Sequence, residues 1–148
     1  MAILRFNPNA NALVFQALVS DGRVVGLDMI VDTGASGTTI PLSVVQRLSL
    51  AASTTQPSSA VTTAQGVTRV PLFTLPRLDA LGQQVRNLDV IGLDLPPTAG
   101  AHGLLGLNFL RSFILVINFP KGKLALLQAN AHPLQRWRGF IELLRVYW

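Results

Sequence analysis

The chain has 148 residues, of which 49% are hydrophobic and 13% are charged, and it contains no cysteine. The length suits one domain, and the lack of cysteine excludes disulfides, thiol catalysis and cysteine-based metal sites. The net charge of +5 comes from basic residues scattered singly along the chain, which does not predict a nucleic-acid surface. Average domains carry about 25% charged residues, so we expect this chain to bury apolar surface against a partner.

Targeting and cofactor signals are missing from the pattern. Residues 1–8 contain no long apolar stretch after a basic start, so we expect no signal peptide. The longest apolar runs are far shorter than the ~20 residues of a spanning helix. His102 and His132 lie far apart and in no ligand-spaced cluster. We therefore expect a cytoplasmic protein that binds neither membrane nor nucleic acid and needs no metal or other cofactor.

The first elements have the pattern of a β-hairpin. Residues 12–19 and 24–31 are rich in apolar and β-branched side chains, and Asp21-Gly22 between them is a strong turn signal. Residues 32–37 then interrupt the apolar run as a loop, and a strand resumes at 38–40.

The middle of the chain mixes one helix with further strands. Residues 41–48 have helical spacing, with Pro41 near the first turn, where proline is tolerated. Residues 51–60 are rich in Ala, Ser, Thr and Pro and predict a mobile surface segment. Residues 61–74 predict two strands around the turn Ala64-Gln65-Gly66.

The rest of the chain predicts more hairpins. Gly82 marks a turn between strands at 75–81 and 84–92, and 95–101 is a proline-rich loop. A short buried strand follows at 104–106 and a helical turn at 108–112. The last unit consists of a strand at 113–119, a turn at 120–123 and a strand at 124–128. The pattern is therefore mainly β, with one or two short helices.

The segment with chemical content is Asp32-Thr33-Gly34. It directly follows the apolar residues 29–31, and a carboxylate at the end of a buried strand is costly without a purpose. Two such acids face to face would share a proton, so that one accepts a proton from water while the other polarises a carbonyl. The tripeptide alone fits an ordinary β-turn, but the apolar run before it and Ala35-Ser36 after it favour a catalytic loop.

Residues 31–36 resemble the active-site motif of retroviral-type (retropepsin-like) aspartic proteases and their bacterial relatives. A second match, residues 103–110, lies at the expected distance downstream. In that family an apolar-apolar-Gly segment threads beside the catalytic loop, and a short helix follows. The strand at 114–119 and the hairpin to 124–126 also fit the bacterial members, so the resemblance covers residues 12–128.

The resemblance implies a retropepsin-like closed β-barrel half over residues 1–130, followed by a C-terminal extension at 131–148. It implies that residues 62–66 form the tip of a flap over the substrate, for which an ordinary exposed hairpin is the alternative. Asn108 stands where many relatives have Asp, and we interpret it as a helix cap without a catalytic role. The implied site residues are the catalytic acid Asp32; the active-site loop residues Thr33 (bonded across the dimer axis), Gly34, Ala35 and Ser36; the flap residues Ala64, Gln65 and Gly66; and the neighbouring loop residues Leu104, Leu105 and Gly106.

Only one acid of this chain, Asp32, is followed by Thr-Gly or Ser-Gly. A pair of catalytic acids therefore needs a second copy of the chain, with 114–119 and the extension as candidate interface. Trp137, Ile141, Leu144 and Trp148 of the extension share one face if it is helical, although Gly139 keeps a strand possible. The sequence thus predicts a homodimeric endopeptidase acting on extended, largely apolar peptides, with a catalytically silent dimeric peptide-binding module as the alternative.

Overall fold

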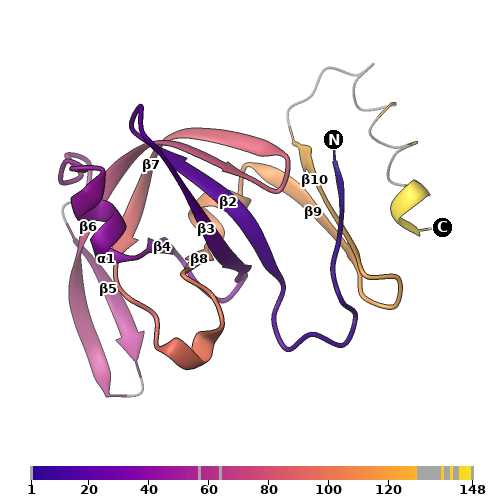
Figure 1. Cartoon of the computed structure of the whole chain (residues 1–148), viewed down its shortest axis with the longest axis horizontal. Helices are drawn as coiled ribbons and strands as arrows, with labels where there is room; N and C mark the ends of the chain where they lie inside the picture. Colours follow the sequence, from indigo (N-terminus) through magenta and orange to yellow (C-terminus); the bar gives the residue numbers. More distant parts are fainter. Residues whose placement is uncertain are drawn as a thin grey trace.

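Strands dominate the computed structural model, which describes residues 2–56, 58–63, 65–129, 138, 141 and 144–147. They form a barrel and a three-stranded sheet that stands beside it (Figure 1). The strands are β1 (Ile3–Arg5), β2 (Val14–Ser20), β3 (Val24–Val31), β4 (Thr38–Ile40), β5 (Ser58–Thr63), β6 (Gly66–Ala80), β7 (Gln83–Gly92), β8 (Gly103–Leu105), β9 (Phe113–Asn118) and β10 (Lys123–Gln128). The helical elements are α1 (Leu42–Arg47), the 3-10 turn η1 (Pro97–Ala99) and α2 (Leu107–Leu110).

Six strands close the barrel in the order β2-β3-β8-β4-β7-β6, because β6 also pairs with β2. The 15 residues of β6 are long enough to serve two purposes. Its second half pairs with β7 and β2, and its first half pairs with β5 in a hairpin that extends from the barrel. Fully buried Met29, Leu75, Leu105 and Phe109 lie in the core. The predicted mainly β, closed-barrel fold is therefore confirmed.

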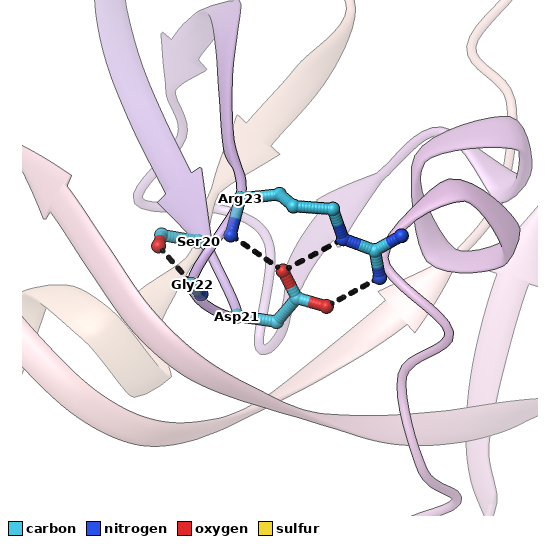
Figure 2. Close-up of polar contacts among 4 residues, drawn as sticks. All are labelled: Ser20, Asp21, Gly22 and Arg23. Atoms are coloured by element: carbon cyan, nitrogen blue, oxygen red, sulfur yellow. Dashed lines mark hydrogen bonds and ion pairs between the residues drawn. The ribbon is translucent and has the colours of Figure 1, made fainter.

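Local polar contacts fix the predicted turn between β2 and β3 (Figure 2). The backbone N–H of Arg23 donates to the Asp21 carboxylate at 2.9 Å, and the Arg23 guanidinium bonds the same group at 2.7 Å. This guanidinium holds the pKa of Asp21 below its ordinary value. Gly22 donates its N–H to the Ser20 hydroxyl and has a φ of +114°, a region that favours glycine.

The predicted surface segment at residues 51–60 is largely exposed where the structure describes it, but its first part is bonded to the sheet. Ser53 is buried, and its N–H donates to the Leu72 carbonyl of β6 at 2.8 Å. The Thr74 N–H donates to the Ala51 carbonyl at 2.9 Å, so the segment continues along β6 until β5 begins. The composition of the segment, rich in Ala, Ser, Thr and Pro, has no strand pattern that would predict this contact.

The three-stranded sheet has the order β1-β10-β9. Leu124 and Leu126 of β10 are fully buried and belong to the same hydrophobic core as the barrel. The sequence did not predict β1, because a strand of three residues is too short to show alternation. Its pairing with β10 brings the N-terminal segment to the sheet that the last strands form.

The described residues of the C-terminal extension, 138, 141 and 144–147, are helical. Its end lies against the three-stranded sheet, since the Asn118 side chain donates to the Val146 carbonyl at 3.0 Å and Lys123 donates to the Arg145 carbonyl at 2.7 Å. The predicted helix positions Trp137 and Trp148 lie outside the described residues. In the part of the chain that the structure covers, no helix has the length and apolar character needed to cross a membrane.

Candidate active site

Asp32 is the first residue after β3 and begins the loop of residues 32–37, called the Asp32 loop here. Its N–H donates to the Leu105 carbonyl of β8 at 3.0 Å. Its half-buried carboxylate accepts the N–H of Gly34 at 2.8 Å. The acid is thus fixed through its backbone by a neighbouring strand and through its side chain by its own loop.

Strand β8 runs parallel to β3 and meets β4 on its other side. Two glycines, one at the start of β8 and one directly after it, make this close packing possible. A Cβ on Gly106 would overlap the Gly37 carbonyl of the Asp32 loop, and one on Gly103 would overlap the Thr39 carbonyl. The absence of a side chain at both positions lets β8 lie between the two ends of the loop.

The start of α2 is hydrogen-bonded to the Asp32 loop. The Leu107 N–H donates to the Ala35 carbonyl at 2.8 Å, and the Asn108 N–H donates to the Ser36 carbonyl at 3.2 Å. The structure therefore places Leu104 and Leu105 in β8, and Gly106 at the start of α2, directly against the loop that carries Asp32.

The helix-cap interpretation of Asn108 is wrong. The N-cap of α2 is Gly106, and no side chain caps it. The Asn108 side-chain oxygen instead accepts both the N–H and the hydroxyl of Thr38, each at 2.8 Å, and its NH₂ donates to the Asp89 carbonyl of β7 at 2.7 Å. Asn108 thus joins the end of the Asp32 loop to β7, the strand that pairs with β4.

Thr38 completes this network from a fully buried position. Its hydroxyl donates to Asn108 and accepts the Gly106 N–H at 3.2 Å. Among the described residues, no buried side-chain nitrogen or oxygen lacks a hydrogen-bond partner. A satisfied buried network of this kind rigidifies the residues that it joins.

The β5–β6 hairpin carries the predicted flap tip. Gln65 and Gly66 lie at its turn, Gly66 with a φ of +125°, and Ala64 lies outside the described residues. The base of the hairpin and the Asp32 loop together line a hollow of about 300 Å³, to which Gln56, Ser59 and residues 36–37 contribute.

Sequence reasoning missed the roles of Thr38 and Asp89. Neither belongs to a motif, and their connection to Asn108 depends on the parallel pairing of β4 with β7. The sequence carries no signal for that pairing.

Comparisons with known proteins found one family and several solved structures that are similar to this chain. Residues 21–112 match the model of the family described as "gag-polyprotein putative aspartyl protease". The fold matches the crystal structure of a retropepsin-like aspartic protease from Rickettsia conorii with a TM-score of 0.61 and 25% identity, over 84% of this chain and 88% of that one. The retroviral protease-like domain of Ddi1 from Leishmania major matches with a TM-score of 0.45 and 14% identity, over 84% of this chain and 100% of that one.

A search of curated proteins gave no match. The family match covers more than half of the chain and includes both the Asp32 loop and the β8–α2 segment that supports it. The chain therefore belongs to the gag-type aspartyl protease family and has a retropepsin-like fold.

Proposed function

We propose that the chain is an aspartic endopeptidase in which two copies of Asp32, one from each subunit of a homodimer, form the catalytic pair. The observation that carries the proposal is the Asp32 carboxylate itself, held by the Gly34 N–H in a loop braced by β8 and α2. A chain that only gripped peptides would have no need to position an acid in this way.

In the proposed mechanism the two carboxylates share one proton. The ionised Asp32 takes a proton from a water molecule, whose oxygen attacks the carbonyl carbon of the peptide bond. The protonated Asp32 of the other subunit donates its proton to the carbonyl oxygen. The resulting tetrahedral diol collapses as a proton passes to the amide nitrogen, which breaks the C–N bond and leaves a carboxylic acid and an amine.

The roles proposed for the other site residues follow from where each lies relative to Asp32 and to the β5–β6 hairpin. Thr33 and Gly34 would lie at the dimer axis and along the cleft, and the hairpin tip at Gln65 and Gly66 would cover the bound peptide. The barrel and three-stranded sheet would constitute the protease domain, 1–130, with the extension packed on that sheet.

The test compares Asp32→Asn with Asp28→Asn. Both changes remove one carboxylate from the same stretch of chain, but Asp28 is 56% exposed on β3 and lies outside the Asp32 loop. A peptide mixture incubated with each protein is analysed by mass spectrometry. We expect Asp32→Asn to lose about 10²- to 10⁴-fold in cleavage rate, with an unchanged circular dichroism spectrum, and Asp28→Asn to remain active. Cleavage by Asp32→Asn at the wild-type rate would contradict the assignment.

A further inference from the structure

The hollow at the base of the hairpin contains a carboxylate that the proposed catalysis does not use. Asp89 of β7 lines it together with Ser36 and Gly37 of the Asp32 loop. We call this hollow the Asp89 pocket. With a volume of about 300 Å³ it has room for one long side chain, and it opens beside the loop where a substrate peptide would pass.

The Asp89 carboxylate is held in place by hydroxyl groups. The Thr55 hydroxyl donates to one oxygen at 2.9 Å, and the Thr74 hydroxyl, directly opposite on β6, donates to the other at 3.4 Å. The ion pairs found between described residues join Asp21, Asp79 and Asp28 to other side chains and do not include Asp89. A partly buried, oriented anion therefore lies in the pocket without a cationic partner from the described part of the chain.

Beside Asp89, on the same paired strands β6 and β7, the wall of the pocket is apolar. Leu72 and Ile91 are both buried and pack with Val70 and Val61 in a small cluster separate from the main core. Gly37 lies against Ile91, where a Cβ would come within 3.0 Å of its Cδ1, so the loop adds no side chain on this side. The pocket thus offers an apolar surface that leads to a negative charge.

From this arrangement we propose that the Asp89 pocket binds a lysine or arginine side chain of the substrate, and this rests on the proposed function. The aliphatic stem would lie along Leu72 and Ile91, and the cationic group would reach Asp89, as long basic side chains do when they bury the stem and keep the charge paired. Because the whole chain has a net charge of +5, general electrostatic attraction does not favour a basic peptide. The preference must come from this local site.

A two-fold dimer would contain the pocket twice. Since a two-fold axis relates the two halves of the cleft, the basic preference should appear at one position on each side of the cleaved bond, at equal distances from it. A profile of cleavage sites in a peptide mixture identifies these positions.

The quantitative test uses three peptides that differ at one such position, which carries lysine, the uncharged isostere norleucine or glutamate. We expect wild-type kcat/KM to be about 10- to 100-fold higher for lysine than for norleucine, and lowest for glutamate. Asp89→Asn should bring the lysine-to-norleucine ratio close to 1, and Asp89→Lys should favour glutamate. Asp28→Asn, with the same loss of charge outside the pocket, should keep the wild-type ratio.

A binding experiment separates this proposal from the proposed function. Fluorescence anisotropy measures the affinity of the Asp32→Asn variant for the same three peptides. Cleavage without lysine selectivity, or with selectivity that Asp89→Asn leaves intact, would overturn the pocket assignment alone. Selective binding that is lost on adding Asp89→Asn, in a protein that cleaves nothing, would support the pocket and overturn the protease assignment. Equal binding of all three peptides with no cleavage would overturn both.

Discussion

Asn108 shows how one amide can fix the end of the Asp32 loop, because it accepts two hydrogen bonds from Thr38 and donates one to the Asp89 carbonyl. Asn108→Asp keeps the acceptor and replaces the donor with an oxygen that faces the Asp89 carbonyl. At pH 8 we expect a loss of about 1–3 kcal/mol in the free energy of unfolding, the cost of an unsatisfied buried group. Urea titrations of the wild type and the variant measure this difference.

The pH dependence of the same variant provides its control. Only the protonated carboxyl can donate to the Asp89 carbonyl, so the folded state should raise the pKa of the introduced acid. The loss in the free energy of unfolding is then fully present above that raised pKa. It becomes smaller as the pH falls toward about 4, the ordinary pKa of an aspartate in the unfolded chain. Asn108→Ala, which has no titratable group, should be equally destabilised relative to wild type at pH 8 and pH 5. A penalty for Asn108→Asp that does not change with pH would contradict the bonding pattern.

At the residue scale, the sequence predicted site residues that are adjacent in the chain and missed contacts between residues that are far apart in it. Asp32, Thr33 and Gly34 form a contiguous motif after an apolar strand, and the carboxylate bond to the Gly34 N–H spans two residues. The bond between Thr38 and Asn108 spans 70 residues, and the amide of Asn108 reaches back 19 residues to Asp89. Such partners are set by strand pairing, which single residues do not encode.

At the scale of elements, the β5–β6 hairpin can be tested with two matched glycines. Gly66 at its tip has a φ of +125° and Gly22 in the β2–β3 turn has a φ of +114°, and apart from the adjacent residues in the chain no atom lies within 4 Å of a Cβ built at either position. Replacing either by valine should cost about 1–3 kcal/mol in backbone strain. If the hairpin covers the substrate, Gly66→Val should also lower kcat/KM by about 10-fold or more, whereas Gly22→Val should not. Equal kcat/KM for the two variants would show that the hairpin is purely structural.

The hairpins at Asp21-Gly22 and Gly82 were predictable because turn residues and alternating strands lie next to each other. Residues 51–53 and β1 were not, since each is a short segment whose strand partner is distant in sequence. Sequence patterns identified the long elements of this fold and missed the short edges that complete its sheets.

At the scale of the whole molecule, the three-stranded sheet ends at β9 in the part of the chain that the structure describes. Among the described strands, β9 has β10 as its sole neighbour, and Ile114 and Phe119 beside this edge are 47% and 54% exposed. Exposed edge strands with apolar side chains are ready to pair with another chain. This edge is the interface that we propose for the homodimer, and it agrees with the high apolar content of the chain.

Activity should therefore depend on protein concentration, because one chain supplies one Asp32 and folding is linked to association. Specific activity should fall as the protein is diluted through its dimer dissociation constant. Sedimentation measures the fraction of dimer at the same concentrations. A tenfold excess of Asp32→Asn chains should lower the activity per wild-type chain roughly tenfold, since most wild-type chains would then be in mixed pairs. Ile114→Lys should shift the dissociation to higher concentration, while Val24→Lys, at a 62% exposed position in the β2–β3 hairpin, should not. A protein that is fully active as a proven monomer would rule out the shared pair of acids.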